Sequence, residues 1–149
     1  MNEGPLDIYR RAVLDHSRAP HNEGQLPSPT GEAKGFNPLC GDKLTIYVTI
    51  AAETVTELSF EGNGCAISIA SASMMTDALT GMSVSDAHEL INEFESMLNK
   101  GEQLSNPRLE ELRALEGVRA YPSRIKCATL AWNAMDAALS GNTGQVSTE

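Results

Sequence analysis

Three cysteines are the most reactive side chains in this chain, and each has a different sequence setting. An odd number of cysteines cannot pair completely into disulfides. Each thiol has glycine, a carboxylate or basic residues close to it, which a thiol needed only for packing would not require. These features indicate one shared metal-binding or sulfur-handling site. The three segments are Asn37-Pro38-Leu39-Cys40-Gly41-Asp42, Gly62-Asn63-Gly64-Cys65-Ala66-Ile67-Ser68 and Arg124-Ile125-Lys126-Cys127.

A closed zinc site would need four ligands, preferably thiolate or imidazole, in a tetrahedral arrangement. The cysteines supply three of them, and Asp42 is the candidate for the fourth. Gly41 separates Asp42 from Cys40 and allows the backbone to bend so that both side chains face one ion. No cysteine pair has the C-x-x-C spacing of a zinc ribbon or a redox motif. Spacing alone therefore leaves open the alternative of three half-buried structural thiols.

Other potential ligands have simpler interpretations. We interpret His16 as a residue at the end of a helix, His21 as a loop side chain and His88 as a surface residue of a helix. A ligand role is the less favoured interpretation for His16 and His21. Met74 and Met75 are expected in the core rather than at a copper site.

Hydrophobic periodicity predicts the elements that position the cysteines. Alternating apolar residues predict strands at 43–50 and 55–60, with a bulge in the second strand where the alternation slips after Val55. Cys40 and Asp42 precede the first strand, and Cys65 follows the hairpin. Pro122-Ser123 opens a helix that places Cys127 in its first turns, where the helix dipole favours a thiolate. Helices are expected at 6–16, 68–80, 83–98, 106–117 and 122–140, and a loop at 20–35. This order of elements predicts an α+β fold.

Length and composition restrict the classes of function. The 149 residues fit one domain, 1–149, with a flexible polar tail at 142–149. The net charge of -9 argues against binding to nucleic acid or to anionic lipid. No apolar run reaches the length of a membrane span, and no signal peptide is visible at the N-terminus. We therefore expect a cytoplasmic protein with no membrane partner, in a compartment where thiols stay reduced.

Taken together and in this order, the three cysteine segments resemble the IscU/NifU-N family of iron–sulfur cluster assembly proteins. The similarity covers most of the chain and is greatest to the SufU branch. It includes segments around the N-terminal helix and after the second cysteine, namely Asp7-Ile8-Tyr9-Arg10, Asp15-His16 and Ala70-Ser71-Ala72-Ser73.

Two departures from the scaffold members of that family favour the SufU branch. Scaffold members have a histidine immediately before the third cysteine, where this chain has Lys126. They also have a Leu-Pro-Pro-Val-Lys segment, whereas this chain has Ala120-Tyr121-Pro122-Ser123-Arg124. SufU members have extra residues between the second and third cysteines, which Gly101 to Gly117 would supply here as an additional helix.

The resemblance implies a small three-stranded antiparallel sheet packed against several helices, as in SufE and NifU proteins. It also implies a zinc-dependent sulfurtransferase that takes persulfide sulfur from a SufS-type cysteine desulfurase and passes it to downstream iron–sulfur assembly proteins. Zinc would be held by Cys40, Asp42, Cys65 and Cys127, with Cys40 as the sulfur acceptor. Arg124 is a candidate to contact the partner or to orient Asp42, and the alternative is a solvated charge. Two other functions remain open. One is a scaffold that binds iron or a [2Fe–2S] cluster on the same ligands, and the other is a zinc-stabilised interaction module.

Overall fold

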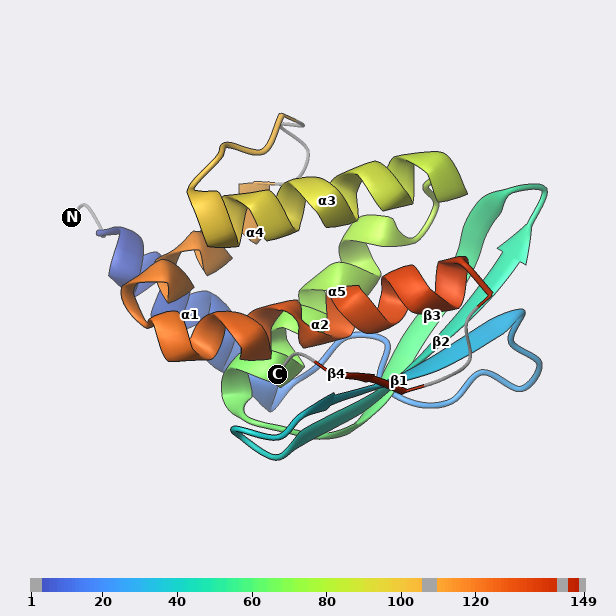
Figure 1. Ribbon diagram of the computed structural model, residues 1–149, viewed down its shortest axis with the longest axis horizontal. Helices are drawn as coiled ribbons and strands as arrows, with labels where there is room; N and C mark the ends of the chain where they lie inside the picture. The colour runs from blue at the N-terminus through green and yellow to red at the C-terminus, as the bar shows by residue number, and fades with distance from the viewer. Residues whose placement is uncertain (1–3, 106–109, 142–144, 148–149) are drawn as a thin grey trace.

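The protein is an α+β domain in which helices cover one face of a sheet (Figure 1). The computed structural model describes residues 4–105, 110–141 and 145–147. The sheet has the strand order β3-β2-β1-β4, in which β1, β2 and β3 are antiparallel and β4 is parallel to β1. The strands are β1 (Gly31–Asn37), β2 (Asp42–Ala51), β3 (Thr54–Asn63) and β4 (Gln145–Ser147).

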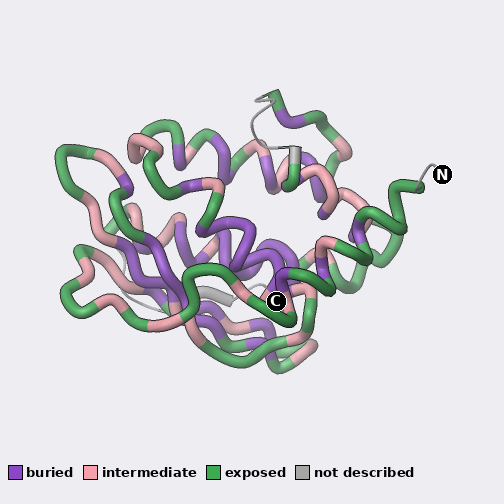
Figure 2. The backbone as a smooth tube through the Cα atoms, turned by 180° about the vertical axis from the view of Figure 1, so that it is seen from behind, coloured by how far each residue is buried: buried purple, intermediate pink, exposed green. Residues whose placement is uncertain are grey.

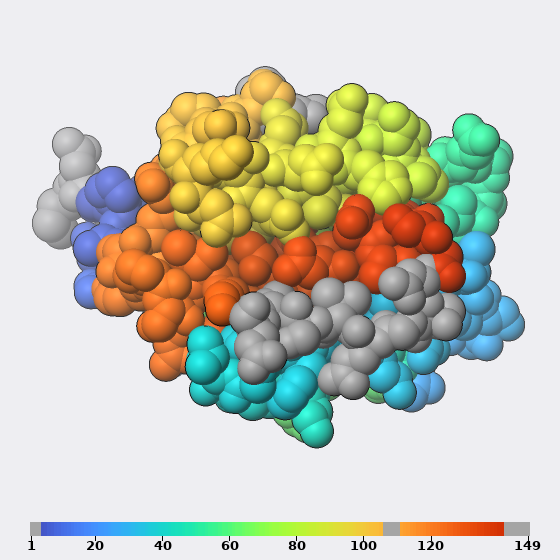
Figure 3. Space-filling model, in the orientation of Figure 1, coloured from blue at the N-terminus to red at the C-terminus, as the bar shows by residue number. Residues whose placement is uncertain are grey.

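Among the described residues there are five α-helices and two short 3-10 helices. Helices α2 and α5 lie directly against the sheet, α1 packs on α2, and α3 packs on α5. Figure 3 shows α3 and α5 side by side across one face of the molecule. The helices are α1 (Pro5–Arg18), α2 (Ala66–Leu79), α3 (Val84–Lys100), α4 (Glu110–Arg113), η2 (Ala114–Ala120), η3 (Pro122–Arg124) and α5 (Ile125–Leu139).

The core lies where α2 and α5 meet the sheet, and buried backbone concentrates at the centre of the molecule (Figure 2). The inner face of β2 contributes Leu44, Ile46 and Val48, as its alternating pattern predicts. On the other side of α5, the rings of Trp132 and Phe94 stack with centroids 4.0 Å apart, which fixes α3 against α5.

The start of β1 lies within the segment that we expected to be a loop, so that prediction was wrong for residues 31–35. The inward residues of β1 are small, which is why no hydrophobic alternation marks the strand. A Cβ atom on Gly35 would lie 2.9 Å from Leu130 Cδ1, and one on Gly31 would lie 2.9 Å from the carbonyl oxygen of Ala138. Small residues are therefore needed because α5 crosses β1 at close range.

The C-terminal segment also differs from its prediction in part. Residues 142–149 were expected to form a flexible tail, but Gln145–Ser147 forms β4 and pairs with Lys34, Gly35 and Phe36 of β1. The rest of that segment lies outside the described residues. A short polar strand at a sheet edge carries almost no hydrophobic signal, so the sequence did not reveal it.

The predicted bulge in the second strand and the predicted helix at 83–98 are confirmed. Thr56 is the extra residue of a bulge in β3, since Thr49 and Ile50 pair with Glu57 and Val55. The Ser83 hydroxyl caps α3 by accepting a hydrogen bond from the Asp86 amide at 3.0 Å, and Gly101 ends the helix with φ 77°.

The helix expected at 106–117 is instead α4 followed by η2, which continues to Ala120, and residues 106–109 lie outside the described residues. Gly117 lies so close to α1 that an added Cβ would be 2.6 Å from Tyr9 Cβ. No described helix combines the length and apolar character needed to cross a membrane.

Candidate metal centre

Cys40 lies in the tight turn that joins β1 to β2. The Gly41 amide donates to the Asn37 carbonyl oxygen at 2.8 Å, and Gly41 has φ 72°, a left-handed conformation that glycine adopts without strain. The neighbouring Leu39 is 68% exposed, while Cys40 is half-buried. The turn therefore presents the Cys40 sulfur at the surface of the site.

Asp42, the first residue of β2, is fully buried. One carboxylate oxygen accepts the Cys65 amide hydrogen at 2.8 Å, and the other accepts the side-chain amide of Asn37 at 3.2 Å. These neutral donors hold the carboxylate in place but do not neutralise its charge. A buried charge is costly unless a cation pairs with it, so the environment of Asp42 suits a bound metal ion.

Cys65 is the N-cap residue of α2, and two glycines precede it, Gly62 near the end of β3 and Gly64 directly after β3. Gly62 has φ 140°, and a Cβ atom on it would lie 2.1 Å from the Lys43 carbonyl oxygen. A Cβ atom on Gly64 would lie 3.0 Å from an oxygen of Asp42. The glycines thus let the start of α2 approach β2 closely enough to place Cys65 beside Asp42.

Cys127 is fully buried in the first turn of α5. Its thiol donates to the Cys40 sulfur at an S–S distance of 3.2 Å, and its sulfur accepts the Asn37 side-chain amide at 3.3 Å. The Ser68 hydroxyl of α2 donates to the Cys127 carbonyl oxygen at 3.3 Å, which fixes α2 against the start of α5.

The three thiols are electrostatically coupled. Contact with the Cys127 thiol lowers the pKa of Cys65 to about 6, against the opposing effect of burial. The same contact, together with burial, raises the pKa of Cys127. The two shifts run in opposite directions, so Cys65 releases its proton more easily than Cys127 does. Metal ligation requires thiolates, so binding of a metal ion here would displace the thiol protons.

One ligand atom from each of Cys40, Asp42 and Cys127 lies within 4.8 Å of the other two. The Cys65 backbone amide donates to Asp42, but the Cys65 sulfur is not part of this group. The fold thus brings three of the four predicted ligands together, and the assignment of Cys65 as a ligand stays a prediction. Three sulfurs and one carboxylate oxygen are a donor set suited to zinc. The zinc assignment itself stays a prediction.

Arg124 lies beside Cys40. Its guanidinium Nη1 donates to the Cys40 sulfur at 3.3 Å, so within the described part of the chain Arg124 is bonded to Cys40 and not to Asp42. The sulfurs raise the pKa of Arg124, and Cys127 makes the largest contribution. This basic side chain thus places a fixed positive charge at the exposed side of the thiol group.

Asn37 and Ser68 are functional residues that the sequence analysis missed. Asn37 is fully buried and orients both Asp42 and Cys127, while Ser68 lies 3.5 Å from the Cys65 sulfur. The Asn-Pro pair ahead of Cys40 was a visible turn signal, but the role of its side chain became clear only from the contacts.

The other candidates lie away from the cysteines. Met74 and Met75 are in the core, as predicted. His88 is partly exposed and contacts Asp136 at 2.8 Å. His16 and His21, by contrast, lie side by side with ring centroids 4.6 Å apart.

The fold and the site define an α+β domain that gathers thiols at one end of its sheet. A family model described as NifU-like N terminal domain matches residues 8–147. The chain belongs to this family.

Two curated relatives carry different functional names. The chain is 42% identical to the iron–sulfur cluster assembly scaffold protein IscU of Streptococcus pyogenes serotype M1, over 89% of this chain and 82% of that protein. It is 36% identical to the zinc-dependent sulfurtransferase SufU of Bacillus subtilis (strain 168), over 92% of each chain.

A solved structure agrees with this family. The putative iron–sulfur cluster assembly scaffold protein for the SUF system from Fervidobacterium islandicum AW-1 superposes with a TM-score of 0.82 at 30% identity, covering 91% of this chain and 99% of that one.

Proposed function

We propose that this protein works in iron–sulfur cluster assembly as a zinc-dependent sulfur acceptor for a SufS-type cysteine desulfurase. The relatives' names support cluster assembly, and one of them is a zinc-dependent sulfurtransferase. The acceptor would pass its sulfur to downstream assembly proteins. A cytoplasmic location, where free thiols persist, is part of this proposal.

The arrangement around Cys40 is the observation that carries the proposal. Cys40 is more accessible than the buried Cys127, and it lies on a turn rather than in a helix. Its sulfur contacts both the Cys127 thiol and the Arg124 guanidinium. Cys40 is therefore easier for an incoming persulfide to reach than Cys127, and it has a positive charge next to it.

Zinc would be held by Cys40, Asp42, Cys65 and Cys127. When bound, zinc keeps the thiols deprotonated at neutral pH and shields them from oxidation. Asn37 would orient Asp42 and Cys127 from outside the ligand set, as supporting hydrogen-bond donors do at metal sites.

The transfer step is a thiolate exchange. The Cys40 thiolate attacks the outer sulfur of the desulfurase persulfide, and a new S–S bond forms on Cys40. The S–S bond within the partner's persulfide breaks, and the partner's cysteine leaves as a thiolate. One sulfur atom moves and no external oxidant or reductant is consumed. Arg124 would neutralise part of the negative charge at Cys40 during the approach.

A scaffold function is the second candidate, and the 42% identity to the Streptococcus pyogenes IscU scaffold favours it. In that case iron or a [2Fe–2S] cluster would occupy the same ligands. A zinc-stabilised interaction module without catalytic function is the third possibility.

Desulfurase turnover distinguishes these functions. A SufS-type desulfurase with L-cysteine should turn over faster with the wild-type protein and not with Cys40→Ala. Ser85→Ala, on the exposed side of α3, should behave as wild type. Lack of stimulation by the wild type would contradict the acceptor function. A reconstituted cluster that persists and transfers to an apo-protein would favour the scaffold.

A further inference from the structure

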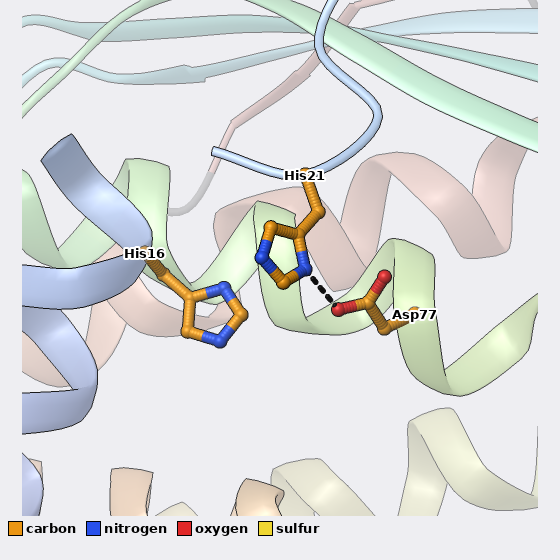
Figure 4. A group of neighbouring side chains, drawn as sticks. All are labelled: His16, His21 and Asp77. Atoms are coloured by element: carbon orange, nitrogen blue, oxygen red, sulfur yellow. Dashed lines mark hydrogen bonds and ion pairs between the residues drawn. The ribbon is translucent and has the colours of Figure 1, made fainter. Parts of the chain in front are cut away.

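A second cluster of potential ligands lies away from the cysteines. His16 is in the last turns of α1, His21 is in the loop that follows, and Asp77 is near the end of α2. One ligand atom from each lies within 4.8 Å of the other two. Figure 4 shows the His16 ring facing His21, and His21 pointing toward the Asp77 carboxylate.

The surrounding hydrogen bonds fix the two rings. His21 Nδ1 lies 2.5 Å from an oxygen of Asp77. Although the His16 side chain is buried, both of its nitrogens have partners, since Nδ1 lies 2.7 Å from the Ser73 hydroxyl and Nε2 contacts Glu111. The Ser73 hydroxyl oxygen also accepts the His21 backbone amide hydrogen at 2.8 Å. One serine therefore holds the two histidine segments at a set spacing.

The chemistry of these donors matches a metal site. Two imidazoles and one carboxylate are the ligands of many zinc sites and of non-haem Fe(II) sites. Ligands 2.0–2.2 Å from one ion lie about 3.3 Å from each other, so His21 and Asp77 would need to separate by less than about 1 Å. Glu111 on the far nitrogen of His16 resembles the carboxylate that orients a metal-bound histidine.

The local charge also favours a cation. Asp77 and Glu111 line a cavity of about 540 Å³ between α2, α3 and α4, and Asp86, Glu89 and Glu93 line it too. Among the described residues that form its wall, none is lysine or arginine. A concave surface of one charge sign raises the local concentration of the opposite ion.

We infer that His16, His21 and Asp77 form a second site, which binds a divalent transition-metal ion of the Fe²⁺ or Zn²⁺ type. It contains no sulfur donor, so its ion is distinguishable from one bound by Cys40, Cys65 and Cys127. The inference does not depend on the sulfur-acceptor function.

Imidazole nitrogen NMR tests this directly. Untagged ¹⁵N-labelled protein is titrated with Zn²⁺ past the first equivalent. The ring nitrogens of His16 and His21 should shift. Those of His88, whose ring contacts the Asp136 carboxylate outside this cluster, should not. Metal analysis should then give about one ion per chain fewer in His21→Asn and in Asp77→Asn than in wild type. His88→Asn is the matched control and should keep the wild-type number.

Two outcomes would overturn the inference. One is that the nitrogens of His16 and His21 stay unshifted, which would make the cluster a hydrogen-bond network only. The other is that the additional ion remains in both variants. Because His21 and Asp77 are more than one-third exposed, both variants should fold. Titration with Co²⁺ reads the two sites separately, since only the cysteine site gives a sulfur-to-metal charge-transfer band.

Discussion

At the residue scale, Asp42 is the ligand whose removal should be most informative. Asp42→Ala removes a buried carboxylate that also accepts the Cys65 amide hydrogen. Loss of an outer-shell partner costs about 10- to 100-fold in metal affinity, and loss of a ligand should cost at least as much. Competition with a chromogenic zinc chelator measures the change. The second variant, Asp42→Asn, keeps a hydrogen-bond acceptor but loses the negative charge. If Asp42→Ala and Asp42→Asn both bind zinc with the affinity of wild type, Asp42 is not a ligand.

Asn37 should matter although it does not bind metal. Asn37→Ala leaves Asp42 and Cys127 without their shared donor, so we expect zinc affinity to fall about tenfold. The free energy of unfolding should fall by about 1–3 kcal/mol, because buried polar groups lose a partner. Chelator competition and urea denaturation measure the two effects. Asn133→Ala on α5 is the control, and equal behaviour of the two variants would contradict the orienting role.

The residue types of the site could be predicted from the sequence, but the supporting contacts could not. Cys40, Asp42 and Cys127 were identified because a thiol or carboxylate beside glycine or basic residues is chemically distinctive. Asn37 was missed because its function depends on which way its side chain points. His16 and His21 were interpreted separately because their proximity to Asp77 depends on how α1 packs on α2.

At the scale of elements, the contact between α2 and α5 holds Cys65 and Cys127 together. The buried Ser71 hydroxyl donates to the Ala128 carbonyl oxygen at 2.6 Å and accepts the Trp132 indole N–H at 3.0 Å. Ser71→Ala should therefore lower the free energy of unfolding by about 1–3 kcal/mol, because the indole N–H of Trp132 and the carbonyl oxygen of Ala128 both lose this hydrogen-bond partner.

Urea denaturation of the metal-free protein measures the effect of Ser71→Ala. Ser85→Ala on exposed α3 surface is the matched control and should change stability by less than about 0.5 kcal/mol. If the two substitutions cost the same, the polar contact between α2 and α5 does not stabilise the fold.

Elements were predictable where local chemistry specifies them. The ends of α3 are set by its capping residues, which are Ser83 with Asp86 at the start and Gly101 at the end. The alternation of apolar and polar residues in β2 defines a half-buried strand. Strand β1 was partly missed because its inward residues are small rather than strongly hydrophobic. Their small size allows α5 to approach the strand. Such a requirement comes from another element and has no local signature.

At the scale of the whole molecule, zinc should stabilise the fold. Cys40, Cys65 and Cys127 come from segments far apart in the chain, so the unfolded chain has no preformed site and binding energy adds to folding energy. Free zinc at about 100 times its dissociation constant should add about 2.7 kcal/mol. Thermal unfolding with zinc and with a chelator measures the difference. An unchanged melting temperature would contradict a structural contribution from the metal.

Alkaline pH should destabilise the molecule through Tyr9. Burial, with a smaller contribution from Tyr121, raises the pKa of Tyr9 to about 12. An unfolded tyrosine has a pKa of about 10, so between about pH 10 and 12 the unfolded chain loses this proton first. The stabilising effect is complete below pH 10 and is lost as pH rises through that window. In Tyr9→Phe, the urea midpoint should fall less steeply with pH between about pH 10 and 12 than it does in wild type. Between pH 7 and 9 the two proteins should show the same pH dependence. An equal slope would contradict the assignment.

The location of the transferred sulfur tests the central claim most directly. Lys34, Lys43, Lys100 and Lys126 place each cysteine in its own tryptic peptide. After incubation with a SufS-type desulfurase and L-cysteine, thiols and persulfides are alkylated and the peptides are analysed by mass spectrometry. We expect one additional sulfur on the peptide 35–43, which contains Cys40, and none in the Cys40→Ala variant. Sulfur on the peptide of Cys65 or Cys127, or on none of the three, would contradict Cys40 as the acceptor.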